Sequence, residues 1–380
     1  MRRGRPWSVL GIAPALLLSC AALPAVAHLP TTTGPARAVA LPVRLSDLSC
    51  PTSLVCVAYG SDATGAPVMF RTTDGAAAWT QESLAPSTPD GYPKEGLSCS
   101  TASQCLGYAT GELDGIASVL YTAFIETTDG GATWTTRPVD NFGGSNVSDP
   151  TCAAPRDCYA IKNLSSVIRS TDGGASWKAV PGSGWPSPTC GGCSSAGLDD
   201  LSCPHASTIC FVVAQDATNA FEFGRTSQGG ARLDRIAHLP GVRGRGGYLV
   251  SCGSARACLV VNAFSTKVLT TSDAGTRWVA RSLPAAVDAV HALSCPSVSV
   301  CVALVHERTH NGQLLAATTR DDGASWTVVA VSSAPAPLWT ASLSCPSASD
   351  CYVAGPAAAP SGSVYARTGA STRWVRTAVT

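Results

Sequence analysis

The octet TTDGGATW at residues 127–134 recurs along the chain and decides its architecture. Its pattern is Ser/Thr-x-Asp-x-Gly-x-x-Trp, and matching octets lie at residues 72–79, 170–177, 271–278 and 319–326. The octet at 72–79 differs from the pattern only at Ala76, which takes the place of the glycine. A sixth octet at 226–233 (TSQGGARL) lacks both the aspartate and the tryptophan, and a shortened copy ends at Trp374.

The residue types of the octet are those that a tight turn between two strands requires. An aspartate side chain accepts hydrogen bonds from backbone N–H groups two residues on, and glycine takes positive φ without steric cost. A tryptophan after the turn covers the hairpin with a large apolar ring. We therefore interpret these residues as structural: Asp74, Asp129, Asp172, Asp273 and Asp321, with Trp79, Trp134, Trp177, Trp278 and Trp326.

Cysteine pairs repeat in step with the octets. The chain has 17 cysteines, and most of the pairs open with the phrase Leu-Ser-Cys. The first cysteines of successive pairs lie 43 to 53 residues apart. Because each pair would straddle a hairpin in an exported protein, we predict seven disulfides. The pairs are Cys50/Cys56, Cys99/Cys105, Cys152/Cys158, Cys203/Cys210, Cys252/Cys258, Cys295/Cys301 and Cys345/Cys351.

Cys190 and Cys193 form a separate Cys-Gly-Gly-Cys motif. A redox motif of this spacing needs a thioredoxin-like strand and helix around it, and no helix pattern surrounds this one. We expect a local structural disulfide.

A period near 50 residues with several turn signals indicates one four-stranded blade per repeat. In the sixth copy we predict strands at 292–294, 301–305, 314–319 and 326–331. The cysteines would span the A–B hairpin and the octet the C–D turn. The sequence thus predicts an all-β, seven-bladed β-propeller at residues 43–380, after a linker at 28–42. The seven copies do not require a swapped strand, although residues 38–41 could pair where the ring closes.

The octet resembles the Asp-box, or BNR, repeat of sialidases, sortilin-type receptors, xyloglucan-degrading hydrolases and photosystem II assembly factor-like propellers. By blade number and octet position the chain most resembles the last of these. The resemblance implies a propeller fold for nearly all of the chain after the signal peptide. It does not imply an activity, because the octet in those families is a structural turn and function depends on sites rather than on folds.

The N-terminus has the layout of a secretory signal peptide at residues 1–27. Arginines precede an apolar run from about residue 9 to 18, and Ala25-Val26-Ala27 is a small-residue cleavage site. A second reading is lipidation at Cys20, since Leu17-Leu18-Ser19-Cys20 loosely resembles a lipobox. A third is an uncleaved anchor. No other stretch is long and apolar enough to span a bilayer, so we expect a secreted or cell-surface protein.

Two motif-based functions are not expected. The net charge of +1, with 13% charged residues, gives no electrostatic basis for binding nucleic acid. Residues 306–310 (HERTH) match the zinc motif His-Glu-x-x-His, but that motif needs a helix to place both histidines on one face. A strand precedes it and an Asn-Gly turn follows, so we predict a solvated loop. No metal or other cofactor is expected.

Strand direction divides the predicted propeller into two faces. The A–B hairpins and the octets emerge on one end, here called the turn face. The B–C and D–A connections, which vary in length, emerge on the other, here called the loop face. Variable loops on a rigid scaffold are where binding usually occurs. Our candidate binding residues there are Tyr92, Glu112, Asp140, Trp185, Asp199, Arg243 and Trp339.

The sequence predicts a non-enzymatic, monomeric binding or scaffold module whose partner is a protein or a glycan. A glycoside hydrolase is the alternative. Sialidases use an arginine triad and an Arg-Ile-Pro motif, and neither is evident; Arg71, Arg169 and Arg225 adjoin the octets on the turn face. Other glycosidases need two carboxylates about 5–9 Å apart. Nothing selects a pair from the loop-face acids Glu112, Asp114, Asp140, Asp199 and Asp200, and the Asp199-Asp200 pair is expected to be solvated before a strand.

Overall fold

The computed structural model describes residues 43–64, 66–84, 96–113, 116–138, 147–182, 197–216, 220–243, 247–307, 313–335, 341–355 and 362–379. These residues contain 28 strands and no helix, and they belong to one compact unit, Ala40–Thr380. The predicted signal peptide, its alternatives at Cys20, the linker and the Cys190/Cys193 pair lie outside the described residues.

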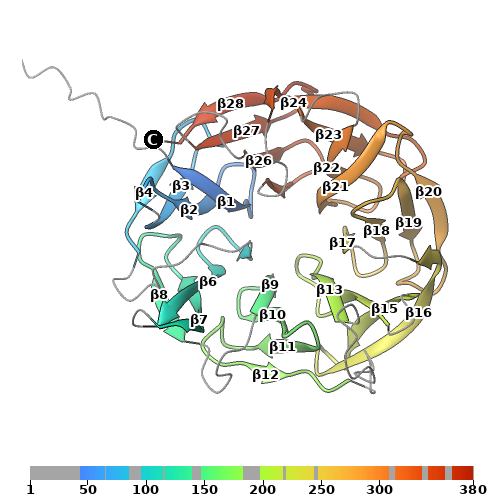
Figure 1. The fold of residues 1–380 in the computed structure, drawn as a ribbon, viewed down its shortest axis with the longest axis horizontal. Coiled ribbons are helices and arrows are strands. Elements are labelled where there is room, and N and C mark those ends of the chain that lie inside the picture. The colour runs from blue at the N-terminus through green and yellow to red at the C-terminus, as the bar shows by residue number, and fades with distance from the viewer. Residues whose placement is uncertain are drawn as a thin grey trace, which may run out of the picture. The chain divides into compact units, whose positions relative to one another are not determined.

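The strands form seven antiparallel sheets of four, which are the blades of a β-propeller (Figure 1). Within each blade the sheet order follows the chain order, with the first strand nearest the centre of the ring. Blades one to three contain β1 (Arg44–Ser49), β2 (Cys56–Ser61), β3 (Pro67–Thr72), β4 (Thr80–Glu82); β5 (Leu97–Cys99), β6 (Cys105–Leu113), β7 (Ile116–Thr127), β8 (Thr135–Pro138); β9 (Val147–Ala154), β10 (Asp157–Lys162), β11 (Ser166–Ser170) and β12 (Lys178–Ala179).

Blades four to seven repeat this arrangement. They contain β13 (Gly197–Ser202), β14 (Phe211–Gln215), β15 (Ala220–Ser227), β16 (Arg232–Arg243); β17 (Tyr248–Cys252), β18 (Cys258–Asn262), β19 (Lys267–Thr271), β20 (Val279–Ser282); β21 (Val287–Ser294), β22 (Cys301–Glu307), β23 (Gln313–Thr319), β24 (Thr327–Pro335); β25 (Ser342–Ser344), β26 (Cys351–Gly355), β27 (Ser363–Arg367) and β28 (Val375–Ala378). The predicted seven-bladed fold is confirmed.

The strands of the sixth blade are longer than predicted because polar residues continue them. β21 begins at Val287 instead of residue 292, and β22 continues to Glu307 instead of ending at residue 305. Asp288 and His306 interrupt the apolar pattern, but His306 Nδ1 lies 2.7 Å from Asp288 Oδ1. This polar contact between neighbouring strands lets the ladder extend where the sequence pattern indicated a loop.

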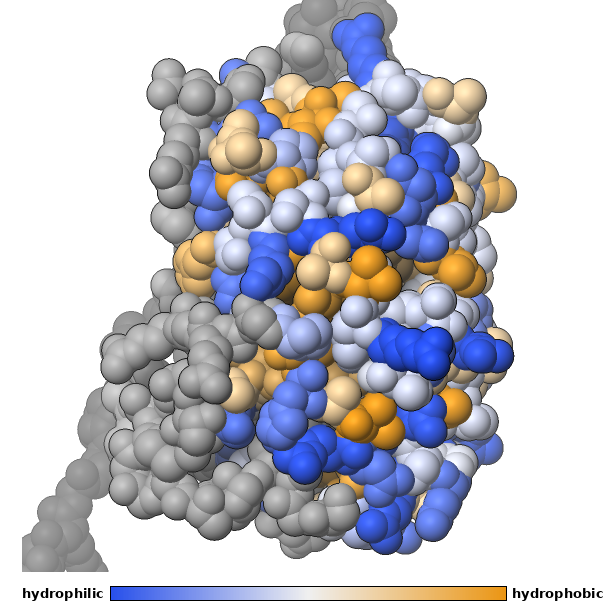
Figure 2. All heavy atoms as spheres, turned by 90° about the vertical axis from the view of Figure 1, so that its right-hand side faces the viewer, coloured by the Kyte–Doolittle hydropathy of each residue, from blue (hydrophilic) through white to orange (hydrophobic). Residues whose placement is uncertain are grey.

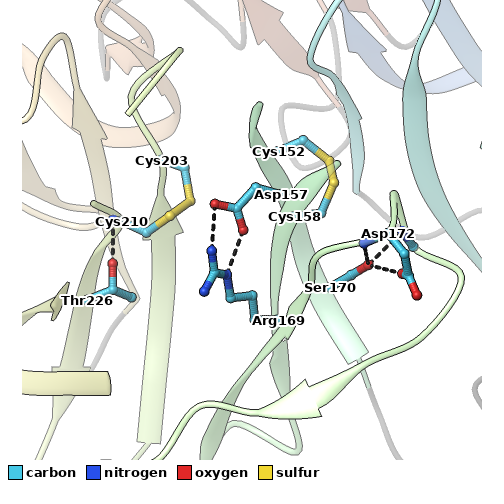
Figure 3. Close-up of polar contacts among 10 residues, drawn as sticks. Cys152, Asp157, Cys158, Arg169, Ser170, Asp172, Cys203, Cys210 and Thr226 are labelled. Atoms are coloured by element: carbon cyan, nitrogen blue, oxygen red, sulfur yellow. Dashed lines mark hydrogen bonds and ion pairs between the residues drawn. A yellow bond between two sulfur atoms is a disulfide. The ribbon is translucent and has the colours of Figure 1, made fainter. Parts of the chain in front are cut away.

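Each octet that keeps its aspartate makes the same hydrogen bonds between two strands. In the octet at 127–134, the Thr127 hydroxyl donates to Asp129 Oδ1 at 2.8 Å and accepts from the Gly131 N–H at 2.9 Å. The Thr133 N–H donates to Asp129 Oδ1 at 3.0 Å. The octets at 72–79, 170–177, 271–278 and 319–326 repeat these bonds. Figure 3 shows the example at Ser170 and Asp172.

A disulfide links the first two strands of every blade, as predicted. Its Cα atoms lie 3.9 to 4.2 Å apart in all seven cases. Two of these disulfides are visible at Cys152–Cys158 and Cys203–Cys210 in Figure 3. In strands β5, β9 and β17 the first cysteine pairs directly with the second across the antiparallel ladder.

The serine directly before the first cysteine of a blade, usually in the Leu-Ser-Cys phrase, connects neighbouring blades. The Ser49 hydroxyl accepts a hydrogen bond from the Cys99 N–H of the next blade at 2.9 Å. Equivalent bonds join Ser98 to Cys152, Ser202 to Cys252, Ser251 to Cys295 and Ser294 to Cys345. The junction between blades three and four differs: there the Ala206 N–H donates to the Ala153 carbonyl at 2.8 Å.

Packing and hydrogen bonds between the last and first blades close the ring. The Cys50 N–H donates to the Ser344 hydroxyl at 2.9 Å, so the serine series continues across this junction. The Ser53 hydroxyl donates to Asp350 Oδ2 at 2.6 Å, and the Tyr352 hydroxyl donates to the Ser53 carbonyl. Both blades supply their own four strands (Figure 1), and their facing sides share one apolar cluster. Within the described residues, no helix is long and apolar enough to cross a membrane.

Candidate functional site in the central channel

The first strands of the blades surround a cavity of about 270 Å³ in the channel of the propeller. The residue three positions before the first cysteine of each blade lines this cavity. These residues are Asp47, Gly96, Asp149, Asp200, Leu249, Ala292 and Ser342. Three of the seven are aspartates, so carboxyl groups from blades one, three and four lie around one small space.

Asp47 is buried and accepts hydrogen bonds from three blades. Its Oδ2 accepts from the N–H groups of Gly96, at 2.7 Å, and Leu97. Its Oδ1 accepts from the Leu48 N–H at 2.7 Å and from the Ser342 hydroxyl at 2.5 Å. Burial raises the pKa of Asp47 and these four hydrogen bonds lower it, and the effect of burial is larger.

Asp200 occupies the equivalent position in blade four and likewise connects two blades. Its Oδ2 accepts from the Val250 N–H of blade five at 2.7 Å, and its Oδ1 accepts from the Leu201 N–H at 2.7 Å. Burial and repulsion by Asp149 raise the pKa of Asp200 well above the ordinary value of an aspartate. Both Asp47 and Asp200 follow a register shift in their strand, which turns the carboxylate towards the next blade.

Asp149 has fewer protein partners than the other two. It has a φ of 54°, a conformation that Asn and Asp adopt more readily than most residues. Burial raises the pKa of Asp149 to about 6, the hydrogen bond with Ser148 opposes the rise, and the nearby charge of Asp47 adds to it. The channel therefore contains a carboxyl group that changes its charge near neutral pH.

Asp199 is the one predicted binding residue whose side chain is described. It lies inside β13 and is partly buried, so the expectation of a solvated acidic pair before a strand was wrong. Burial raises the pKa of Asp199 to about 7, against a hydrogen bond with the Tyr248 backbone. Its Oδ2 is buried without a hydrogen-bond partner. However, Asp199 does not line the channel cavity, because its neighbour Asp200 does so.

Two histidines lie in the described strands of blade six. His291 lines the cavity, its Nε2 is buried without a partner, and burial lowers the pKa of its ring. His306 and Glu307, the first two residues of the HERTH motif, lie in β22 and contact neighbouring strands. The prediction of a solvated loop was wrong for these two residues. His310 lies outside the described residues.

Asp216, Glu222 and His238 have potential metal-ligating atoms within 4.8 Å of one another. A cation already occupies this position, since Arg235 Nη1 lies 2.8 Å from Glu222 Oε1. The Asp216 carboxylate also accepts the Ala220 N–H at 2.9 Å. The arginine explains the buried glutamate without a metal ion.

Two hairpin tips on the loop face expose apolar side chains that sequence reasoning missed. Leu164 lies between β10 and β11 and is 53% exposed, and Phe264 lies between β18 and β19 and is 69% exposed. Leu164 has a φ of 55°, and its carbonyl accepts the Leu198 N–H at 2.6 Å. That contact accounts for the backbone conformation but not for the exposed side chain. The signal was present in the sequence as an apolar residue inside a short polar turn.

The remaining candidates cannot be placed in a site. Tyr92, Asp140, Trp185 and Trp339 lie outside the described residues, as do the side chains of Glu112 and Arg243. On the side of the molecule seen in Figure 2, hydrophobic residues are scattered among hydrophilic ones and form no broad patch.

No family model matches the sequence, and no curated protein matches it. Solved structures match it in fold. A structure titled YCF48 bound to D1 peptide has a TM-score of 0.58 at 13% identity, covering 87% of this chain and 94% of that one. YCF48 from Cyanidioschyzon merolae gives 0.54 at 13% identity, covering 86% and 96%. The GH74 xyloglucanase from Xanthomonas campestris gives 0.63 at 15% identity, covering 90% of this chain and 55% of that one.

Proposed function

We propose that this chain is a secreted binding or scaffold module that acts through its loop face on a protein or peptide, and that it is not an enzyme. The channel carboxyls carry the proposal. Asp47 and Asp200 use both carboxylate oxygens to accept hydrogen bonds, mainly from backbone N–H groups, between blades. Asp47 accepts four hydrogen bonds, about as many as a carboxylate has lone pairs, so it is poorly suited to act as a nucleophile or base; Asp200 accepts two and joins blades four and five.

The loop face offers chemistry that suits a protein ligand. Leu164 and Phe264 present apolar side chains from two blades that flank blade four. Exposed aromatic side chains are typical anchors of protein interfaces. The structure of YCF48 with a bound D1 peptide is similar to this chain in fold, and the match covers 94% of the YCF48 chain. Seven disulfides are compatible with an extracellular location, which the predicted signal peptide also favours.

A glycoside hydrolase is the second candidate because Asp199 has a suitable protonation state. A carboxyl with a pKa of about 7 can act as a general acid. Catalysis would also need a second carboxylate across an open cleft. Asp199 does not line the described channel cavity, which makes this function the weaker proposal.

One experiment separates the two functions. Random peptides displayed on phage are selected on the wild-type protein and counter-selected on a Leu164→Ser, Phe264→Ser double variant. A glycan array tests in parallel whether the protein binds sugars. We expect peptides whose affinity falls at least about tenfold in the double variant, as loss of an aromatic anchor predicts. A Leu54→Ser variant on the turn face is the control, since Leu54 is 60% exposed there.

The same protein is incubated with fluorogenic β-glucosides and sialosides, and we expect no turnover. Hydrolysis that disappears in Asp199→Asn would contradict the proposal and favour the enzyme. Selected peptides that bind the double variant as well as they bind the wild type would show that the loop-face tips are not the binding site.

A further inference from the structure

The turn face has a groove between blades five and six with a cavity of about 370 Å³, larger than that of the channel. The end of β19, the octet and the last strand of blade five form one wall, with Thr270, Val279 and Arg281. The disulfide hairpin and octet turn of blade six form the other, with Val298 and Asp322. Val279 and Val298 are 47% and 54% exposed, so apolar surface borders the groove on both sides.

The groove between blades two and three is built from the same positions and provides an internal comparison. It has a cavity of about 260 Å³. In β8, Arg137 lies three residues after the octet tryptophan, as Arg281 does in β20. Arg137 lies diagonally across from Glu126, and Arg281 has the same relation to Thr270.

Contacts with the next blade confirm that Glu126 and Thr270 are equivalent. A Cβ atom built on Gly174 of blade three would lie 3.4 Å from Glu126 Oε2. A Cβ atom built on Gly323, the same octet position in blade six, would lie 3.5 Å from Thr270 Cγ2. The two side chains therefore fill the same place in their grooves, and only one of them carries a carboxylate.

The arginines differ accordingly. Arg137 forms an ion pair with Glu126. Arg281 forms no ion pair within the described part of the chain, and its Nε is buried without a hydrogen-bond partner. A buried N–H of a charged group without an acceptor is costly, because it has lost its water and gained nothing in exchange.

Two other arginines, Arg169 and Arg235, have a carboxylate partner, whereas the Nε of Arg71 in blade one is, like that of Arg281, buried without a hydrogen-bond partner. Arg169 Nε donates to Asp157 Oδ1 at 2.6 Å and its Nη2 to Asp157 Oδ2 at 3.0 Å (Figure 3). Arg235 pairs with Glu222 at 2.8 Å. The two aspartates in the groove of blades five and six do not serve Arg281: Asp273 Oδ1 accepts from Thr271 and the Arg277 N–H, and Asp322 makes no ion pair among the described residues.

We propose that the groove between blades five and six is a binding site for a carboxylate ligand, whose carboxylate takes the place that Glu126 occupies in the equivalent groove and pairs with Arg281. Thr270 leaves the room for it, and the flanking Val279 and Val298 contact the apolar part of the ligand. An acidic side chain of a peptide and the carboxylate of a uronic acid share this chemistry.

Ligand-observed NMR titration of the whole protein tests the site with three probes: Ac-Glu-NH2, glucuronate and Ac-Gln-NH2. We expect the charged probe that fits to bind with a Kd in the millimolar range, at least about tenfold more tightly than uncharged Ac-Gln-NH2, because hydrogen bonds to an ionised acceptor are the stronger kind. Stronger binding of Ac-Glu-NH2 indicates a peptide source, and stronger binding of glucuronate a sugar.

Two reciprocal variants complete the test. Thr270→Glu supplies the missing carboxylate from the protein, so we expect binding of the charged probe to fall at least about tenfold while the melting temperature holds or rises. Glu126→Thr frees Arg137, so we expect a second site of similar affinity in the groove of blades two and three. The melting temperature of each variant shows that it is folded.

The proposal would be overturned if neither Ac-Glu-NH2 nor glucuronate bound more tightly than Ac-Gln-NH2, or if the charged probe bound folded Thr270→Glu as well as the wild type. Arg281→Gln gives a second reading of the same site, since it keeps the length of the side chain and removes the charge. Retention of carboxylate binding in Arg281→Gln would also overturn the proposal. These variants leave the loop-face tips unchanged, so the result is independent of the function proposed above.

Discussion

The octet turns and the inner ring of the propeller contain the same kind of hydrogen bond, but the bonds join residues at very different separations along the chain. In both, a Ser, Thr or Asp oxygen accepts a backbone N–H. In the octet at 170–177, Asp172 and Ser170 bind groups two to four residues away. In the inner ring, Asp47 binds groups 49, 50 and 295 residues away, and Ser49 binds one 50 residues away. The octets therefore shape each blade, and the inner ring joins the blades.

The different surroundings give aspartates opposite pKa shifts. At Asp172 burial is slight and would raise the pKa, but the hydrogen bonds from Ser176 and Ser170 outweigh it and lower the pKa to about 2. At Asp149 burial dominates and raises the pKa to about 6. Both effects are general: hydrogen bonds to the charged form favour ionisation, and loss of water opposes it.

The largest loss of stability is expected from removing Asp47, the inner-ring carboxylate that accepts the most hydrogen bonds. Asp47→Ala leaves the N–H groups of Gly96, Leu97 and Leu48 without this acceptor. We expect a loss of about 3–5 kcal/mol of unfolding free energy, in the range of disrupted buried networks. Urea unfolding with the disulfides intact measures it. Asp172→Ala is the matched octet variant. Equal losses of unfolding free energy in the two variants would show that the hydrogen bonds of the inner ring stabilise the fold no more than those of an octet.

The second prediction concerns the pH dependence of stability. The pKa of Asp149 is about 6 in the folded protein and about 3.9 in an unfolded chain. The folded state therefore holds this proton more tightly, so its stabilisation is complete below pH 4 and is lost as the pH rises through 6. We expect the unfolding free energy to fall by about 2 kcal/mol between pH 4.5 and pH 7.5.

Asp149→Asn is the control for this pH dependence. Asparagine suits the positive φ at this position and carries no charge. Melting temperatures recorded across the pH range should show a flatter slope in the variant than in the wild type. The slope that remains is expected from Asp47, Asp199 and Asp200, whose pKa values burial also raises. An unchanged slope in Asp149→Asn would contradict the assignment.

The third prediction concerns Asp172 in the octet, where the pH dependence of stability is opposite to that at Asp149. Asp172→Ala removes the acceptor for the Ser176 N–H at 2.9 Å, and we expect a loss of about 1 kcal/mol at pH 7. Because the folded pKa of Asp172 is lowered to about 2, the stabilisation by Asp172 is present above pH 4 and is lost as the pH falls towards 2. The variant should therefore lose less stability than the wild type in acid. Unfolding by acid, followed by tryptophan fluorescence, measures the difference.

The features that could be predicted from the sequence are those formed by residues close together in the chain. The octet turns and the cysteine hairpins involve residues close in sequence, so their spacing and residue types predicted them. The role of the serine in Leu-Ser-Cys could not be predicted, since its partner lies in the next blade. Ring closure could not be predicted either, because the hydrogen bond from Cys50 to Ser344 joins residues 294 positions apart in the sequence.

The candidate site was predicted least well for the same reason. Asp47, Asp149 and Asp200 occupy equivalent positions in blades one, three and four, but nothing in the sequence around them distinguishes them from the other acidic residues. They become a cluster only when the ring brings their strands together. Asp199 was selected for its charge, whereas its unusual pKa arises from burial in β13 that the alternating pattern did not indicate.

The last comparison, which includes the smallest expected effect, tests whether the serine series itself holds the blades together. Ser251→Ala removes the acceptor of the Cys295 N–H, a 2.8 Å bond between blades five and six, and we expect a loss of about 1 kcal/mol. Thr151 occupies the same position in blade three, but at that junction Ala206 and Ala153 supply the bond instead. Thr151→Ala should therefore cost at most about 0.5 kcal/mol, the usual range for substitutions away from such bonds. Urea midpoints of both variants provide the comparison, and similar losses would show that the hydroxyl at this position stabilises the blade by packing alone.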